Sequence, residues 1–181
     1  MSGISPDPEF PRGLIALLPR LRRYARVLTR DAGAADDLVQ DTLERAWTRQ
    51  RQWRPGSDLR AWLFSIMHNR HVDLVRGSLA RPEAPALRQD DEAWPAEPAD
   101  AGGHAAIDPI DLQRCFERLS GEHRQVLMLV AVEELSYDEA ARAMGVPVGT
   151  VMSRLSRARA RLRAELADDA GRPGARLTRI K

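Results

Sequence analysis

The segment from 147 to 166 carries the side chains best suited to chemistry, and the chemistry that they suit is DNA recognition. Thr150, Ser153 and Arg157 recur at spacings of three and four, so a helix would place them near one face, opposite an apolar stripe that includes Val151 and Leu155. Arginine can donate two hydrogen bonds to guanine, and hydroxyl groups reach base edges or phosphates. Further arginines would meet phosphates and add affinity that does not depend on base sequence. The predicted duplex-binding residues are Thr150, Val151, Ser153, Arg154, Ser156, Arg157 and Arg161.

The residues just upstream would position this basic helix. Ser136 and Glu139 have the spacing of a capping box, in which each side chain satisfies a backbone donor near the other. Gly145 suits the left-handed end of that short helix, and Pro147 suits the first turn of the next one. A short capped helix, a tight turn and a longer basic helix predict a helix-turn-helix, whose second helix enters the major groove. The alternative is a solvated basic helix in another kind of bundle, which the cap, the glycine and the proline disfavour.

The N-terminal part of the chain has the pattern of a small helical bundle. Apolar residues at helical spacing predict three helices, over residues 13–29, 34–51 and 58–76. Pro19 interrupts the first helix and either kinks it or delays its start. Asp36 and Asp37 are expected in the first turn of the second, where the helix dipole favours negative charge. Ser57 or Asp58 can cap the third helix. Short connections between amphipathic helices favour a three-helix bundle.

Charge is distributed unevenly along the chain, although the formal net charge is only +2. Residues 83–111 hold eight acidic side chains against one arginine, and residues 142–181 hold ten basic side chains against three acidic ones. The helical periodicity vanishes over 77–107, which contains four prolines and reads as a flexible acidic linker. We therefore predict an all-α fold of two small helical modules with a basic, polyanion-binding end. The expected divisions are 1–76, 77–107, 108–168 and a basic tail over 169–181.

Several classes of function are disfavoured by what the sequence contains. Cys115 is the single cysteine, so no internal disulfide can form, and its apolar helical face indicates a packed thiol. No apolar run approaches the roughly 18 residues of a membrane span. His68 and His71 are three residues apart, but no further ligands complete a metal site. We find no nucleophile motif, phosphate loop or cofactor signature. The expected protein is cytoplasmic, is not an enzyme, and uses neither metal nor cofactor.

The chain resembles the extracytoplasmic-function (ECF) sigma factors of bacterial RNA polymerase in two sets of motifs. The first set resembles the family's region 2 and comprises residues 35–42, Arg45-Ala46-Trp47, residues 60–64, Asn69-Arg70 and Asp73. The second resembles region 4 and comprises Leu119-Ser120, Arg124, and residues 134–141, 145–151 and 153–159. Two motif sets in the right order with a linker between them are more specific than one helix-turn-helix.

The resemblance implies a division of labour between the modules. It implies that region 2 binds core RNA polymerase and melts the promoter −10 element, and that region 4 binds the −35 element as duplex. It also suggests regulation by an anti-sigma factor, and an acidic linker suits the basic RNA exit path. The residues implied in polymerase binding are Asp36, Asp37, Leu38, Gln40 and Asp41. Leu38 also lies on the apolar stripe of its helix.

The residues that the resemblance implies at the −10 element are Trp53, Asn69, Arg70 and Asp73. The Asn69 amide can bond the edge of an extruded base, and Trp53 can offer a stacking face from its loop. Trp62 lies on an apolar stripe and is expected in the core. At Met152 many relatives carry a basic residue, and at Ser156 some carry a larger one, so the preferred −35 sequence stays open.

Two other functions fit parts of the sequence. The first is a sigma-like decoy or adaptor that binds an anti-sigma factor and never contacts a promoter. The basic helix and Asn69 argue against it, because a decoy needs no side chains that read DNA. The second is an ordinary helix-turn-helix repressor or activator. That function would leave the first module and the acidic linker without a purpose, and it would usually require a dimer.

Overall fold

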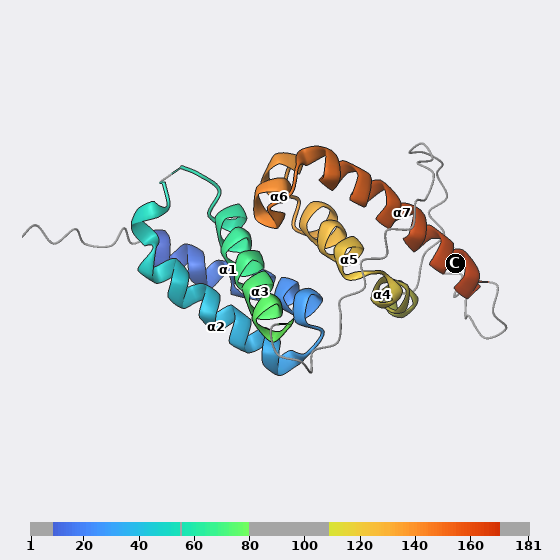
Figure 1. The fold of residues 1–181 in the computed structure, drawn as a ribbon, viewed down its shortest axis with the longest axis horizontal. Coiled ribbons are helices and arrows are strands. Elements are labelled where there is room, and N and C mark those ends of the chain that lie inside the picture. The colour runs from blue at the N-terminus through green and yellow to red at the C-terminus, as the bar shows by residue number, and fades with distance from the viewer. Residues whose placement is uncertain (1–8, 55, 80–108, 171–181) are drawn as a thin grey trace, which may run out of the picture.

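The computed structural model describes residues 9–54, 56–79 and 109–170, and every regular element in these ranges is helical. The N-terminal module contains three α-helices and a short 3-10 turn, and the C-terminal module contains four α-helices and a π-helical segment (Figure 1). The N-terminal elements are α1 (Glu9–Thr29), α2 (Ala32–Thr48), η1 (Gln50–Gln52) and α3 (Leu59–Leu79). The C-terminal elements are α4 (Pro109–Arg118), α5 (Gly121–Leu127), η2 (Met128–Val132), α6 (Tyr137–Met144) and α7 (Val148–Ala170). The predicted all-α fold of two modules is confirmed.

The N-terminal bundle closes around aromatic side chains. Tyr24 of α1 and Phe64 of α3 are fully buried, and their rings meet edge to face with centroids 5.2 Å apart. Phe10 is 2% exposed, and its ring lies 5.6 Å from that of Trp53. Because Phe10 belongs to this core, α1 begins at Glu9 rather than at residue 13, and it continues through Pro19. Pro19 therefore does not delay the start of the helix.

Two aspartates begin the next helices, and one of them was not predicted. The Asp31 side chain accepts a hydrogen bond of 2.7 Å from the Ala34 amide, so α2 begins two residues earlier than predicted. Asp36 and Asp37 consequently lie beyond the first turn, and the prediction that they occupy it is wrong. Asp58 caps α3 by accepting from the Arg60 amide at 2.8 Å, which decides between the two caps that the sequence left open.

The C-terminal module has a side-chain cap at the start of α5 and ion pairs between α4 and α7. Ser120 accepts from the His123 amide at 3.3 Å to begin α5, and Cys115 is buried as a packed thiol. Burial is the main cause that raises the pKa of the Cys115 thiol. Arg118 joins α4 to α7 through Glu165 at 3.5 Å and Asp169 at 3.3 Å. These contacts make α4 part of the helix-turn-helix module.

The predicted boundaries move by a few residues. Helix α3 continues to Leu79, so residues 77–79 are helical rather than linker, and α7 continues to Ala170, two residues into the predicted tail. The rest of the predicted linker and tail, and residues 1–8, lie outside the described residues. Among the helices described, none is long and apolar enough to cross a membrane.

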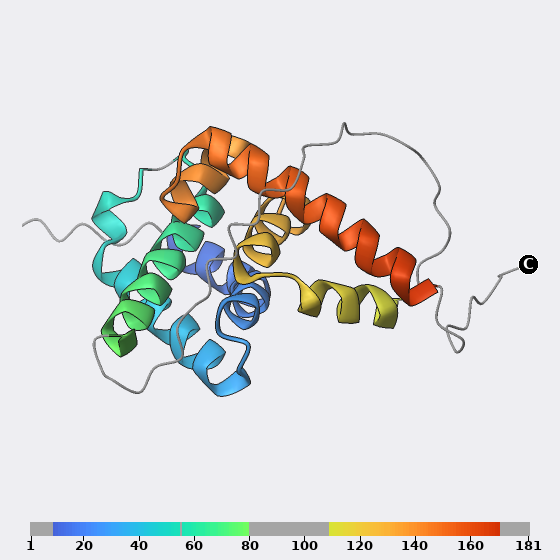
Figure 2. The ribbon, with the colours of Figure 1, turned by 45° about the vertical axis from the view of Figure 1, so that its right-hand side comes forward.

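The two modules pack against each other. Helix α6 lies against α3, and α5 and η2 lie against α1 (Figure 2). Polar contacts cross the interface: Arg30 donates to the Glu117 carbonyl at 3.2 Å, Arg60 donates to the Glu133 carbonyl, and the Glu133 carboxylate faces α1. The sequence predicted the modules separately and gave no indication of this interface.

Candidate nucleic-acid interface

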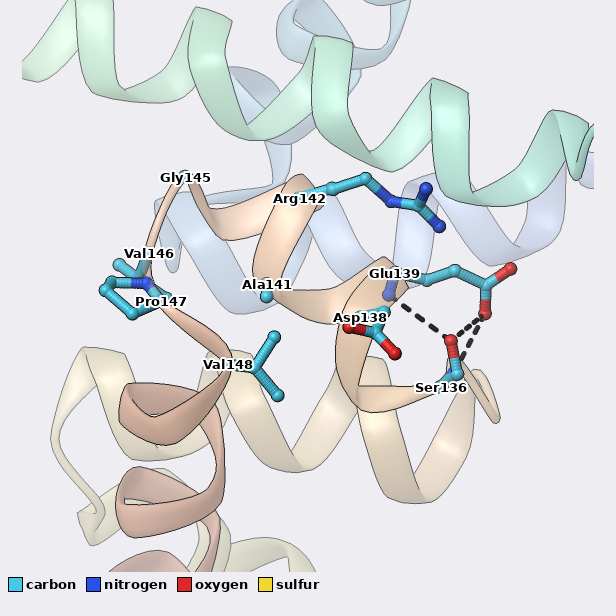
Figure 3. A pocket seen from close by; sticks show the side chains of 9 residues that line it. All are labelled: Ser136, Asp138, Glu139, Ala141, Arg142, Gly145, Val146, Pro147 and Val148. Atoms are coloured by element: carbon cyan, nitrogen blue, oxygen red, sulfur yellow. Dashed lines mark hydrogen bonds between the residues drawn. The ribbon is translucent and has the colours of Figure 1, made fainter.

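The turn between α6 and α7 has the geometry of a helix-turn-helix. Ser136 accepts from the Glu139 amide at 3.3 Å, and Glu139 accepts from the Ser136 amide at 2.8 Å, so the predicted capping box is present (Figure 3). Gly145 ends α6 with φ 65°, in the left-handed region that glycine adopts at low cost. Pro147 precedes α7, and its carbonyl accepts from the Thr150 amide at 2.9 Å. A shallow pocket lies between α6 and the first turn of α7, with Arg142 on its rim.

The inner face of α7 fixes the helix within its module. Val151 and Ala158 are fully buried, and Leu155 is 2% exposed. Val151, which was predicted among the duplex-binding residues, thus packs its side chain in the apolar core of the module rather than on the outer face of α7. Met152 is 52% exposed and lies on the open side of the same helix.

The outer face of α7 presents the remaining predicted residues. Ser153 and Arg161 are exposed, and Thr150, Ser156 and Arg157 are half-buried. The first turns hold their hydroxyl groups close to the backbone, since Ser153 Oγ donates to the Thr150 carbonyl at 3.1 Å. This face combines hydroxyl groups with guanidinium groups, which is the chemistry that reads base edges and grips phosphates.

Two of the predicted arginines already have acidic partners. Arg154 pairs with Glu122 of α5 at 2.7 Å and is about one-fifth exposed, and Arg161 pairs with Glu165 at 2.8 Å. Arg154 would have to leave Glu122 to reach DNA. Arg157 lies between them, and it forms no ion pair within the part of the chain that the structure describes.

The pKa of His123 on α5 shows the effect of the positively charged arginines on α7. The pKa of His123 is lowered, first by burial and then by Arg157, Arg154 and Arg161, while Glu122 acts in the opposite direction. Three guanidinium groups of α7 thus lie close enough to disfavour a fourth positive charge. The same field attracts phosphate anions to this surface.

The predicted −10 residues divide into one that is free to bind and three that are engaged. Asn69 is exposed on α3. Arg70 donates to Asp41 of α2 at 2.6 Å, and Asp73 lies 3.9 Å from Arg45, which is also on α2. Trp53 is half-buried against Phe10, and its Nε1 is buried without a hydrogen-bond partner among the described residues. Stacking of a base on Trp53 would require its ring to leave this aromatic cluster.

The predicted polymerase-binding residues lie along α2 and divide by exposure. Asp36, Asp37 and Gln40 are exposed, whereas Leu38 is 1% exposed in the bundle core. The Leu38 side chain thus packs inside the module, whereas the other predicted polymerase-binding side chains lie at or near the surface of α2. Asp41 is half-buried and paired with Arg70, so the structure joins one predicted polymerase residue to one predicted −10 residue.

Two residues with a clear part in this arrangement were missed by the sequence reasoning. Arg45 lies one turn from Asp41 on α2 and forms the second link to α3. Glu133 is 1% exposed between the modules. Arg45 lies within a motif that the resemblance covered, but its partner is 28 positions away on another helix. No local pattern marks Glu133 as buried.

Comparisons with known proteins place both modules. Residues 14–68 match the family model described as the Sigma2 domain of PhyR, and residues 110–162 match the model described as Sigma-70, region 4. These two models divide the chain as the structure does. They define a sigma-type protein with a region 2 module and a region 4 module.

The similarity extends over most of the chain. It is 35% identical over 153 residues to the ECF RNA polymerase sigma factor EcfG of Rhodopseudomonas palustris, covering 84% of this chain and 82% of that protein. It is 34% identical over 143 residues to the ECF sigma factor SigM of Mycobacterium tuberculosis, covering 79% and 69%. The chain belongs to the family of ECF RNA polymerase sigma factors.

Solved structures share the arrangement. The sigma factor RpoE of Bartonella quintana, in complex with the anti-sigma factor NepR, matches with a TM-score of 0.68 and 34% identity, covering 88% of this chain and 97% of that one. The PhyRSL–NepR complex from Sphingomonas sp. Fr1 matches with a TM-score of 0.58 and 25% identity, covering 86% and 87%.

Proposed function

We propose that this sigma factor divides promoter recognition between the outer face of α7 and the exposed side of α3. In this proposal Ser153 and Arg157 read the −35 element in the major groove, and Asn69 binds an extruded base of the −10 element. Asp36, Asp37 and Gln40 bind core RNA polymerase through the exposed side of α2. The observation that carries the proposal is the exposed polar face of α7 above a buried apolar face, in a chain that is similar to a sigma factor over 84% of its length.

Arg70, Asp73 and Asp41 take a supporting part in this proposal. Their ion pairs hold α3 against α2, so the helix that binds polymerase also orients the helix that carries Asn69. Arg161 adds phosphate affinity that does not depend on sequence, and Arg154 does so when it leaves Glu122. The protein acts in the cytoplasm, with polymerase and DNA, as a transcription factor rather than an enzyme.

We also propose control by an anti-sigma factor. The support is the similarity to RpoE of Bartonella quintana, which is described in complex with NepR. The matched partner would be a protein of the NepR kind encoded by the same host. Binding of such a protein to the purified chain, in competition with core polymerase, tests this part separately.

A second candidate is a decoy that captures an anti-sigma factor. The observation that favours it is the match of residues 14–68 to the Sigma2 domain of PhyR, a protein whose sigma-like part is described in complex with NepR. A decoy needs neither the Arg157 face nor Asn69. A decoy would bind the anti-sigma factor and leave core polymerase unbound.

Transcription with purified components tests the proposed function. The full chain is added to core polymerase with a pool of genomic promoter fragments from its host, and the transcripts are sequenced. We expect start sites that share two upstream sequences at fixed spacing, lost with Arg157→Ala and with Asn69→Ala. Absence of both polymerase binding and initiation would contradict the proposal and favour the decoy.

A further inference from the structure

The interface between the modules contains a buried charge. Glu133, at the end of the π-helical segment η2, is 1% exposed, and its two carboxylate oxygens lie 3.6 Å from Arg20 and 3.7 Å from Arg23 of α1. Neither oxygen has a hydrogen-bond partner among the described residues. The carboxylate is thus removed from water and compensated only by charges that belong to the other module.

The backbone around Glu133 is held in the same place. Arg60 of α3 donates to its carbonyl and also pairs with Asp58 at 3.0 Å, so two helices of the N-terminal module hold this residue. Glu134, the next residue, adopts φ 55°, and the chain turns there toward the Ser136 cap of α6. The helix-turn-helix therefore begins directly after the residue that α1 and α3 hold.

The energetic consequence is conditional. A buried carboxylate costs several kcal/mol unless opposite charges compensate it, and removing one partner of a buried pair is strongly destabilising. Arg20 and Arg23 are about half exposed, so they lose little hydration in the packed arrangement. When the modules separate, Glu133 returns to water and the cost disappears. Glu133 therefore favours packing of the modules while the arginines face it and opposes packing when they are lost.

The packed arrangement cannot serve both promoter elements, an argument that rests on the proposed function. Elements named −10 and −35 are about 25 base pairs apart, or roughly 85 Å at about 3.4 Å per pair. In the structure α6 of the helix-turn-helix lies against α3, which carries Asn69 (Figure 2). Residues 80–108 connect the modules and, fully extended, reach about 100 Å, so covalent geometry permits separation.

We propose that Glu133, with Arg20 and Arg23, is an electrostatic latch that holds the helix-turn-helix module on the N-terminal module and must open for promoter binding. The latch differs from the apolar part of the interface because its contribution to the free energy of packing changes sign with the charges present. Loss of the arginines opens it, and further loss of the carboxylate closes it again.

Single-molecule energy transfer on the full chain tests the latch without DNA or polymerase, so its failure is distinct from failure of the proposed function. Dyes are attached at Arg51→Cys and Asp168→Cys, both exposed, in a Cys115→Ala background. We expect Arg20→Gln with Arg23→Gln to shift the closed-to-open ratio toward open by at least about tenfold, because the buried charge is left uncompensated. Circular dichroism verifies that the helices remain folded.

Two further variants make the test specific. Adding Glu133→Gln to the double variant removes the uncompensated charge and is expected to restore the closed state. Arg22→Gln with Arg26→Gln removes the same charge from the exposed side of α1 and is expected to leave the ratio unchanged. An unchanged ratio in the first double variant, or opening that Glu133→Gln does not reverse, overturns the latch.

Discussion

The two helices that we propose to bind DNA, α7 and α3, hold their polar side chains differently. On α7, Ser153 and Arg161 stand exposed above a buried face of Val151 and Ala158, so reading and packing lie on opposite sides of one helix. On α3, two of the predicted −10 residues are tied to α2 by ion pairs. In the C-terminal module, the side chains proposed to bind DNA are therefore distinct from those that stabilise the fold. In the N-terminal module, some of the predicted −10 residues also stabilise the fold.

The largest expected effect separates the two faces of α7. Val151→Asp places a carboxylate in a fully buried site and is expected to destabilise the C-terminal module by at least about 3 kcal/mol. Met152→Asp, at the neighbouring exposed position, is expected to change the free energy of unfolding by less than about 0.5 kcal/mol. Urea unfolding followed by circular dichroism measures both. Equal effects at the two positions would show that the faces of α7 are not distinct.

The second effect concerns the pH dependence of the N-terminal module. Burial, then the charges of His71 and Arg154, lower the pKa of His68 to about 4 from an ordinary value of 6.5. The Tyr24 hydroxyl and His68 Nδ1 share a hydrogen bond of 3.2 Å, and burial raises the pKa of that tyrosine, so the hydroxyl keeps its proton.

Neutral His68 is therefore favoured in the folded state, and the unfolded chain binds more protons between pH 4 and 6.5. Stability is present in full above pH 6.5 and falls as pH decreases toward 4, by up to about 3 kcal/mol from this residue. Urea unfolding across this range measures the slope. His68→Gln should flatten it, and His123→Gln in the other module should leave most of it. A slope as steep in His68→Gln as in the unchanged chain would contradict the assignment.

The third effect concerns loss of DNA binding without loss of fold stability. Arg157→Ala is expected to weaken binding to the −35 duplex by about 1–3 kcal/mol and to relax the preference at one base pair. Arg163→Ala, two turns further along, is expected to weaken binding equally for all sequences and to reduce the salt dependence. Fluorescence anisotropy with matched and mutated duplexes measures both. Unfolding of either variant would contradict the separation of reading from packing in α7.

The smallest expected effect tests the coupling of α3 to α2. Asp41→Asn removes the 2.6 Å pair between Asp41, whose side chain is 36% exposed, and Arg70, and should cost up to about 1 kcal/mol of stability. It should also reduce promoter melting, because one of the two ion pairs described between α3 and α2 is lost. Asp37→Asn, at an exposed position, should leave stability unchanged and reduce affinity for core polymerase. If both variants behaved alike, the ion pair would have no positioning role.

Local signals accounted for most of the fold. The capping box of Ser136 and Glu139, the left-handed Gly145 and the caps at Asp58 and Ser120 depend on residues within three positions of one another. Such contacts form from the sequence alone, because neighbouring backbone groups supply the partners. They located the helix-turn-helix and the beginning of α3 correctly.

Two residues carried two predictions each. Val151 and Leu38 lie on apolar stripes, and the periodicity placed them inward, as the structure does. They were also predicted to bind DNA and polymerase, roles for which the structure shows no exposed side chain at these two positions. For a residue on the apolar stripe, helical periodicity was the better guide, because it reports packing directly.

Contacts between distant helices could not be predicted. Arg70 and Asp41 are 29 positions apart, and Arg60 and Glu133 are 73 positions apart. Each partner alone reads as a solvated charge on a helix. Their meeting depends on how α2, α3 and η2 pack, which charge patterns along one helix do not contain.

Footprinting of promoter complexes tests most directly the central claim that the two modules read different elements. Holoenzyme formed with the full chain is probed with permanganate for unpaired thymines at −10 and with DNase for protection at −35. The account predicts that Asn69→Ala abolishes the permanganate signal while −35 protection persists, and that Arg157→Ala removes the −35 protection. Loss of −35 protection with Asn69→Ala, or retention of all signals in both variants, would contradict the division of labour between α3 and α7.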